Sequence, residues 1–294
     1  MAIPVIDFSK INGEEREKTL SEIAKACEEW GFFQLVNHGI PLELLNKVKK
    51  LASDCYKTER EEAFKTSTPV KLLNECLRKT LERSSRTLTG KIPQPNEWPS
   101  NTSGLKETMV EYREEVRKLA SKMMEVMDEN LGLPKGYIKK AFNEGMEDGE
   151  ETAFFGTKVS HYPPCPHPEL VNGLRSHTDA GGVVLLFQDD EYDGFKYGEW
   201  IDVQPMPNAI VINTGDQIEV LSNGRYKSAW HRVLAREEGN RRSIASFYNP
   251  SYKAAIGPAA EEGSEKKYPK FVFGDYMDVY ANQKFMPKEP RFLL

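Results

Sequence analysis

His177 and Asp179 are the residues whose types and spacing point most directly to chemistry. They stand two positions apart, and residues i and i+2 of a β-strand project from the same face. An imidazole and a carboxylate placed in this way can bind one metal ion. A His-x-Asp pair can equally be a hydrogen-bonded pair at the surface. Because two protein ligands rarely hold a transition metal well, a metal site here requires a third ligand.

His231 is the best candidate for that third ligand among the five histidines of the chain. In the segment 226–235 it alternates with Ala229, Val233 and Ala235 on one small, apolar face. Such alternation predicts the inside of a β-structure. Two histidines and one carboxylate, with three coordination positions left open, are the arrangement used by non-haem Fe(II) oxygenases.

Arg241 and Ser243 begin another strand-like run, which ends near Pro250. On a strand they share one face with Ala245 and Phe247, whereas Arg242 points to the opposite side, where we expect it to be solvated. A guanidinium beside a hydroxyl can bind a carboxylate. The same residues can also form an ordinary ion pair inside a barrel.

Helical periodicity dominates the first half of the sequence, and strand periodicity follows it. Apolar residues recur at steps of three and four, most regularly from Leu105 to Leu131. From Phe154 the pattern changes to short apolar runs such as 183–188 and 209–213, which are typical of covered strands. An amphipathic helix is expected at 271–285. We therefore predict an α+β fold, in which helices support a two-sheet β-barrel.

This pattern divides the chain into three expected regions. Residues 1–150 are mostly helical and supporting, with short strands at 4–8 and 32–36. Residues 151–250 form the barrel core, and residues 251–294 form a C-terminal helix and a basic tail. The segment 144–151 is acidic and is expected to be an exposed loop.

Composition excludes several classes of function. The chain has 294 residues, of which 39% are hydrophobic, and it contains no apolar run of about 18 residues that could span a bilayer. The net charge of −5, without a long basic block, argues against nucleic-acid binding. The first residues lack the basic and apolar regions of a secretory signal, so we do not expect one. Four scattered cysteines without a CxxC pair favour free thiols in a reducing compartment, so we expect a cytoplasmic protein. The oligomeric state is left open.

Four segments together resemble one known family. They read WGFFQLVNHG (30–39), FGTKVSHYPPCP (155–166), LRSHTDAGG (174–182) and KFMPKEPR (284–291). The first segment and the His-x-Asp pair are typical of the Fe(II)/2-oxoglutarate-dependent dioxygenase superfamily. The second and fourth are more specific to its 1-aminocyclopropane-1-carboxylate oxidases, the ethylene-forming enzymes of plants. The chain resembles this family over nearly its whole length.

The resemblance implies a double-stranded β-helix, or jelly-roll, core and an oxidoreductase activity. Fe(II) would be held by His177, Asp179 and His231. Ascorbate, rather than 2-oxoglutarate, would supply electrons, and bicarbonate or CO2 would act as activator. The expected substrates are 1-aminocyclopropane-1-carboxylate and O2, and the expected products are ethylene, cyanide and CO2.

The resemblance also suggests residues that contact small molecules. Arg241 and Ser243 would hold a carboxylate of substrate, ascorbate or bicarbonate. Lys158 and Arg175 match family residues implicated in substrate or bicarbonate binding, although Lys158 can equally be a solvated strand lysine. Further candidates are the C-terminal basic residues Lys284 and Arg291, which a solvated tail would also explain, and the pocket residues Thr157, Tyr162, Gln188, Asn213 and Phe247. Tyr162 and Asn213 are also candidates to orient metal ligands.

Two segments, 75–100 and 193–200, depart from the family pattern. Residues 76–91 are basic and rich in Ser and Thr where relatives have an acidic-aromatic strand, so we expect them outside the barrel. Residues 193–200 are several positions shorter than in relatives, which should remove or truncate a strand. Two alternatives to an active oxidase therefore stay open. One is a catalytically impaired variant, and the other is a 2-oxoglutarate-dependent hydroxylase of a plant metabolite.

Overall fold

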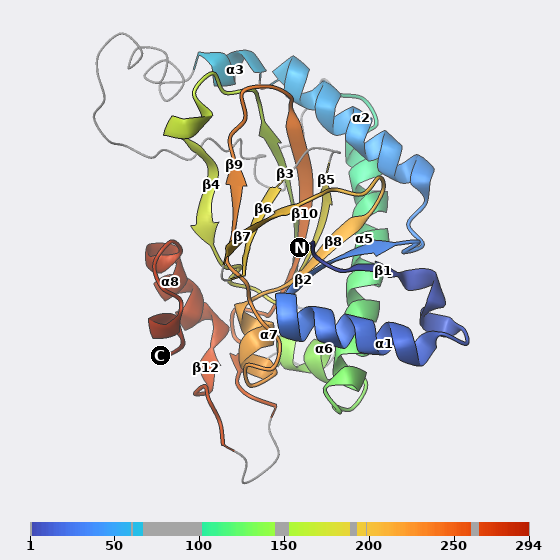
Figure 1. Cartoon of the computed structure of the whole chain (residues 1–294), viewed down its shortest axis with the longest axis vertical. Helices are drawn as coiled ribbons and strands as arrows, with labels where there is room; N and C mark the ends of the chain where they lie inside the picture. The colour runs from blue at the N-terminus through green and yellow to red at the C-terminus, as the bar shows by residue number, and fades with distance from the viewer. Residues whose placement is uncertain are drawn as a thin grey trace.

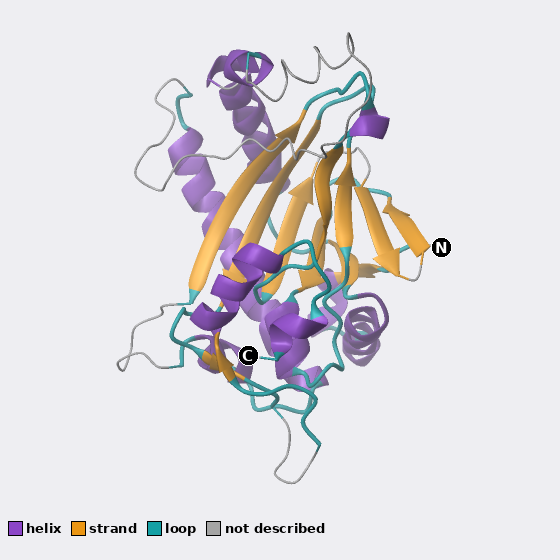
Figure 2. Ribbon diagram, turned by 90° about the vertical axis from the view of Figure 1, so that its left-hand side faces the viewer, coloured by secondary structure: helices purple, strands orange, loops and turns teal. Residues whose placement is uncertain are grey.

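The computed structural model describes residues 2–59, 61–66, 102–144, 153–188, 193–197, 199–259 and 265–293. The segment 75–100 and most of the expected acidic loop 144–151 lie outside the described residues. Two β-sheets stand side by side, with helices around them (Figures 1 and 2). No helix in the described ranges is long and apolar enough to cross a membrane.

The larger sheet has six strands, and the smaller has four. Neighbouring strands are antiparallel except for the first two of the larger sheet. This arrangement is the predicted jelly-roll core. In spatial order the larger sheet is β1 (Val5–Asp7), β2 (Phe32–Val36), β8 (Ile210–Thr214), β5 (Val183–Gln188), β10 (Arg241–Asn249) and β3 (Phe154–Tyr162), and the smaller is β4 (Asn172–His177), β9 (His231–Leu234), β6 (Asp193–Tyr197) and β7 (Glu199–Val203).

The long helix α5 (Leu105–Asn130) packs against the larger sheet at β5 and β10, and α2 (Leu42–Glu59) packs against α5. Its apolar stripe from Leu105 to Val126 is buried as predicted, and Leu131 is partly buried. Tyr112 of α5 lies against Phe187 of β5, with ring centroids 6.4 Å apart. The other helices are α1 (Arg16–Lys25), the π-helical turn η2 (Ala26–Trp30), α3 (Glu61–Lys65), α6 (Tyr137–Phe142), α7 (Asp216–Leu221), α8 (Phe273–Gln283) and the 3-10 turns η1 (Phe8–Asn12), η3 (Pro168–Leu170) and η4 (Glu289–Phe292).

Two details differ from the expected boundaries. The N-terminal strands, which were expected at 4–8 and 32–36, belong to the barrel rather than to a separate supporting region, because β1 and β2 join the edge of the larger sheet. The C-terminal helix begins at Phe273 rather than Phe271, since residues 271–272 form β12 and pair with β11 (Ala255–Ile256). This small ribbon leads the chain into α8.

The shortened segment 193–200 still forms a strand, so the expectation that the strand is removed was wrong, while its truncation relative to the family stays a prediction. Residues 193–197 form β6, which pairs along its length with β7, from Asp193 opposite Val203 to Tyr197 opposite Glu199. β6 also pairs with β9, where Phe195 stands opposite His231. Five residues are the common length of a strand, so the short hairpin still supplies hydrogen bonds to both neighbours.

Gly31 joins η2 to β2 at a point where a side chain does not fit. Its φ is +70°, and a Cβ atom there would lie 2.2 Å from the carbonyl oxygen of Lys227. That carbonyl accepts a hydrogen bond from the Thr214 hydroxyl, and the Lys227 N–H donates to the carbonyl oxygen of Cys27, so the backbone cannot easily retreat.

We predict that Gly31→Ala lowers the melting temperature clearly more than Gly39→Ala. Gly39 has φ +88° but nothing within 4 Å of an added Cβ, so it carries only the left-handed backbone cost of about 1–2 kcal/mol. Gly31→Ala adds a clash with a fixed carbonyl. Thermal unfolding of both variants checks this, and equal melting temperatures would contradict it.

Candidate metal centre and active site

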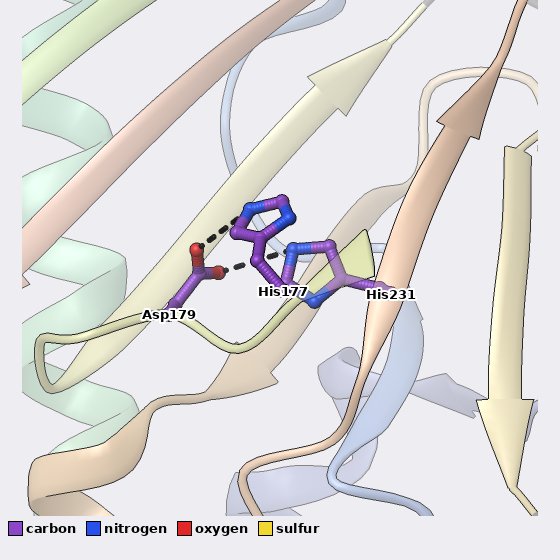
Figure 3. Close-up of side chains that lie close together, drawn as sticks. All are labelled: His177, Asp179 and His231. Atoms are coloured by element: carbon purple, nitrogen blue, oxygen red, sulfur yellow. Dashed lines mark ion pairs between the residues drawn. The ribbon is translucent and has the colours of Figure 1, made fainter. Parts of the chain in front are cut away.

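His177, Asp179 and His231 converge at one end of the smaller sheet (Figure 3). His177 Nε2 lies 3.6 Å from Asp179 Oδ1, and His231 Nε2 lies 3.5 Å from Asp179 Oδ2. One ligand atom from each residue falls within 4.8 Å of the others. Three donors at these separations can contact one ion placed between them.

The strand pairing of β4 and β9 brings the two histidines together. His177 ends β4 and stands opposite His231, the first residue of β9, with ring centroids 4.3 Å apart. Between Leu174 and His177 the register shifts, because β4 advances three residues while β9 advances two. Such a bulge re-aims a side chain. Asp179 lies beyond the strand end, so the expectation that both residues of the pair share a strand was wrong.

Backbone carbonyls orient both imidazole rings. His177 Nδ1 lies 2.8 Å from the carbonyl oxygen of Arg175, and His231 Nδ1 lies 3.1 Å from that of Ala229. A carbonyl only accepts, so each Nδ1 carries the proton and donates. A neutral ring has one such proton, and each Nε2 therefore offers a lone pair towards Asp179.

The surroundings of His177 and Asp179 shift their pKa values in the directions that favour binding of a cation. Burial lowers the pKa of His177 well below its ordinary value, and nearby His231 lowers it further, although Asp179 opposes both. Burial alone would raise the pKa of Asp179, but the two histidines and the Asn213 amide outweigh it, so this pKa is lowered. The Asn213 amide donates to Asp179 Oδ2 at 2.8 Å. Imidazole nitrogens and a carboxylate oxygen are ligands that suit Fe(II).

A cavity of about 100 Å3 opens beside these three side chains. Arg241 and Ser243 of β10 face it together with Gln188 of β5, which stands opposite Ser243. Arg241 is 5% exposed and donates to Ser243 Oγ at 3.3 Å and to Gln188 Oε1 at 3.1 Å. Its guanidinium carbon lies 5.0 Å from the centre of the Tyr162 ring. The positive charge of Arg241 therefore borders the same small cavity as the three candidate metal ligands.

Thr157 and Lys158, neighbours on β3, were both expected to contact small molecules, but their side chains lie on opposite faces of the strand. Lys158 lines the cavity, in line with Ser160 and Tyr162 on the same face of the strand. Thr157 faces the other way and its hydroxyl lies 3.1 Å from that of Ser246, so it does not line the cavity. The period of two in a strand makes such neighbours diverge.

Arg242 also faces away from the cavity, as predicted, but it is not simply solvated. Its Nη1 donates to the hydroxyl of Ser53 in α2 at 2.5 Å, and the residue is partly buried. Arg242 thus ties the barrel to the helical layer.

The remaining basic candidates approach from outside the cavity. Arg175 places its guanidinium carbon 3.8 Å from the centre of the Phe285 ring. Lys284 is half-buried, and burial lowers its pKa, as does Lys158, while Asp179 raises it. Arg291 is fully buried and donates to Thr178 Oγ1 at 2.9 Å. Neither the cavity nor solvent is in contact with Arg291.

Several residues of the site were not predicted. Phe32 of β2 lies edge-on to His231 at 5.2 Å between ring centroids, and Arg232 stacks at 3.9 Å on the ring of Trp200. The alternation of apolar residues in strands was the one sequence signal that could have identified some of these residues. Contacts between distant strands leave no local pattern in the sequence. The apolar part of the cavity wall is formed by Phe32, Leu174, Val184, Leu186, Val203, Val211, Val233, Ala245 and Phe247.

Family models match two parts of the chain. The model of the 2OG-Fe(II) oxygenase superfamily matches residues 154–250, and the model described as non-haem dioxygenase in morphine synthesis N-terminal matches residues 3–71. Among solved structures, JOX2 in complex with 2OG, Fe and JA has a TM-score of 0.78 and 31% sequence identity, over 99% of this chain and 88% of that one.

Curated relatives match over the whole length. 1-Aminocyclopropane-1-carboxylate oxidase 5 of Arabidopsis thaliana is 86% identical, over 100% of this chain and 98% of the relative. The 1-aminocyclopropane-1-carboxylate oxidase of Musa acuminata is 65% identical, over 99% of this chain and 98% of the relative. A chain with this sequence identity, a jelly-roll core and a cluster of two histidines and one aspartate belongs to the 1-aminocyclopropane-1-carboxylate oxidase family of the 2OG-Fe(II) oxygenases.

Proposed function

We propose that this protein oxidises 1-aminocyclopropane-1-carboxylate with O2 to ethylene, cyanide and CO2, with Fe(II) as metal and ascorbate as reductant. One observation carries the proposal. A set of two histidines and one carboxylate borders a small cavity with a buried arginine, in a chain 86% identical to a curated oxidase of this name. Bicarbonate or CO2 is proposed as activator.

His177, Asp179 and His231 would hold Fe(II) from one side. When bound, the ion supplies the binding and activation of O2, which side chains alone do not provide. The protein keeps both Nε2 atoms unprotonated through the Nδ1 hydrogen bonds, and Asn213 holds the carboxylate in place. Positions of the ion away from these ligands would face the cavity.

Arg241 and Ser243 would orient a carboxylate of the substrate, ascorbate or bicarbonate. Charge-assisted hydrogen bonds from a guanidinium are strong and directional. The apolar wall, which includes Phe247, excludes water and strengthens this attraction. A cavity of about 100 Å3 suits a small amino acid.

Lys158, Arg175 and Lys284 are proposed to attract the anionic cosubstrates. Lys158 is the best placed, because it lines the cavity. Lys284 lies close enough to Asp179 and Lys158 for their charges to influence its pKa. We also propose a cytoplasmic location, which the buried free thiols of Cys27, Cys55 and Cys165 support.

The runner-up is a 2-oxoglutarate-dependent hydroxylase. The pair Arg241 and Ser243 can hold the carboxylate of 2-oxoglutarate as well, and JOX2, which is similar in fold, was solved with 2OG. The 86% identity to a curated oxidase, over the whole of this chain, favours the oxidase.

Removal of any one metal ligand should abolish turnover. His177→Ala, Asp179→Ala or His231→Ala leaves two ligands, which cannot hold the ion on one face, so Fe(II) titration should show sharply weaker binding. His161→Ala and His167→Ala are the matched controls and should bind iron normally. Normal iron binding by His231→Ala would refute the assignment of the third ligand.

Loss of the buried arginine should weaken productive binding selectively. Arg241→Ala removes charge-assisted hydrogen bonds worth roughly 1.5–3 kcal/mol, so kcat/KM should fall about ten- to a hundredfold. Arg242→Ala should leave kcat/KM unchanged and cost only stability, because its partner is Ser53 of α2. Equal losses of kcat/KM in both variants would contradict the assignment of Arg241 to the cavity face of β10 and of Arg242 to the opposite face.

Cosubstrate dependence separates the two candidate functions. Purified protein with Fe(II), ascorbate, bicarbonate and 1-aminocyclopropane-1-carboxylate should release ethylene, measured in the headspace, without 2-oxoglutarate. Omission of ascorbate should reduce ethylene strongly. Turnover that requires 2-oxoglutarate would favour the hydroxylase, and an iron-loaded protein inactive under all conditions would favour the impaired variant.

A further inference from the structure

The short helix α7 and the C-terminal tail, residues 284–293, meet through two matched charge pairs. α7 carries Asp216 and Glu219, three residues apart, and the tail carries Lys288 and Arg291, also three apart. Arg291 Nη1 lies 3.6 Å from Asp216 Oδ2, and Lys288 Nζ lies 2.7 Å from Glu219 Oε2. Figure 1 shows the tail end of the chain at α8, near α7 and below β4. We call this arrangement the two-rung clamp.

The first rung is connected to the loop that carries two of the candidate ligands. Arg291 donates to Thr178 Oγ1 at 2.9 Å, and that hydroxyl donates to Asp216 Oδ2 at 3.1 Å. Thr178 stands between His177 and Asp179 in the sequence. The backbone N–H of Asp216 also donates to the carbonyl oxygen of Asp179 at 2.8 Å. The side chains of Arg291 and Asp216 are completely buried.

Two tyrosines of α8 strengthen the same connection. Tyr280 donates to the carbonyl oxygen of Thr178 at 2.7 Å, and Tyr276 donates to Asp216 Oδ2 at 2.5 Å. Thr178 is therefore held at its hydroxyl and at its backbone, by α7 on one side and by the C-terminal segment on the other.

The second rung reaches the segment that carries the third candidate ligand. Lys288 Nζ donates to the carbonyl oxygen of Ser228 at 2.7 Å, and the N–H of Ser228 donates to Glu219 Oε2 at 2.6 Å. Ser228 precedes Ala229, whose carbonyl oxygen accepts the hydrogen bond from His231 Nδ1. The first rung thus contacts the segment of His177 and Asp179, and the second contacts the segment that leads to His231.

The first rung is a poor way to gain stability. Burying an ion pair costs desolvation energy that a well-packed apolar pair of the same size avoids. What an apolar pair cannot supply is a directed hydrogen bond to Thr178. We therefore attribute to the pair of Arg291 and Asp216 a role in fixing the position of Thr178 rather than in stabilising the fold.

We propose that Arg291 and Lys288 are positioning residues: the C-terminal tail closes a two-rung clamp on α7, and this clamp fixes the segments 177–179 and 228–231 in the geometry that binds the metal. Neither residue lines the cavity. Arg291 is expected to act through Thr178, and Lys288 through Ser228. This inference rests on the metal site of the proposed function and adds to it the part of the chain that shapes the site.

The sign of the change in metal affinity distinguishes this role from others. Arg291→Met removes a positive charge near a bound cation, so electrostatics alone would make Fe(II) bind more tightly. An arginine that binds bicarbonate or ascorbate would leave Fe(II) affinity unchanged when those anions are absent. The clamp predicts that Arg291→Met binds Fe(II) about 10–100-fold more weakly, which is the usual effect of losing a residue that supports a metal ligand. This result differs both from tighter binding and from unchanged binding.

The experiment is anaerobic Fe(II) titration of metal-free protein without substrate, ascorbate or bicarbonate. Wild type is compared with Arg291→Met, Lys288→Met and Thr178→Val, which removes the hydroxyl without changing the charge. Each should bind Fe(II) more weakly, and the visible spectrum of the Co(II) protein should change. Lys270→Ala, which removes an exposed pair with Glu144, is the control and should match wild type in both readouts.

A double variant provides the second test. Asp216→Asn combined with Arg291→Met removes the unpaired buried carboxylate but does not restore the hydrogen bond from Arg291 to Thr178. The clamp therefore predicts that Fe(II) binding stays weak in the double variant, and recovery of the wild-type affinity would show that the unpaired carboxylate, rather than the lost contact, caused the loss. If Arg291→Met does not fold, Arg291→Lys and Thr178→Val carry the comparison, with an intermediate loss expected. Unchanged or tighter Fe(II) binding in the folded variants would overturn the clamp. Failure of wild type itself to bind Fe(II) would instead overturn the proposed metal site.

Discussion

The pairing of His177 with His231 across β4 and β9 is the constraint on which the rest of the site depends. A pair directly opposite in an antiparallel sheet is held at one separation by the backbone. The bulge before His177 turns its ring towards its partner, and the loop after it returns Asp179 to the same point. A one-residue slip would send one imidazole to the other face of the sheet and leave no set of three ligands.

The larger sheet adds the second half of the chemistry. β10 places Arg241 and Ser243 on the inner face, where Ser243 stands opposite Gln188 of β5. The regular geometry of the strand is enough to direct the buried guanidinium of Arg241 at the cavity. α5 covers the outer face of these strands and gives them a rigid support. The ligands and the guanidinium thus come from two sheets. The cavity between them has a metal-binding side and an anion-binding side, and these are the two elements that a small zwitterionic substrate requires.

Much of this could be predicted from local patterns, and the remainder could not. The stripe of α5, the strands β5 and β8 and the inward face of β10 all follow periods of 3.6 or two, so their residues could be identified from the sequence. The opposite directions of Thr157 and Lys158 follow from the period of two, so they could have been predicted. The bulge in β4 and the hydrogen bond from Arg242 to Ser53 depend on register and on contacts between distant segments. The burial of Arg291 was missed for the same reason, because a basic tail normally favours water and only Asp216 and Thr178 make its burial possible.

The position of one iron ion, between the three side chains and the cavity, is the central claim. Anomalous diffraction at the iron edge, from crystals grown anaerobically with Fe(II) and 1-aminocyclopropane-1-carboxylate, measures that position directly. We predict a single strong peak bonded to His177 Nε2, His231 Nε2 and an Asp179 carboxylate oxygen, with the substrate in the cavity that Arg241 borders. A peak at another set of side chains, or no peak at these three in protein that forms ethylene, would contradict this placement.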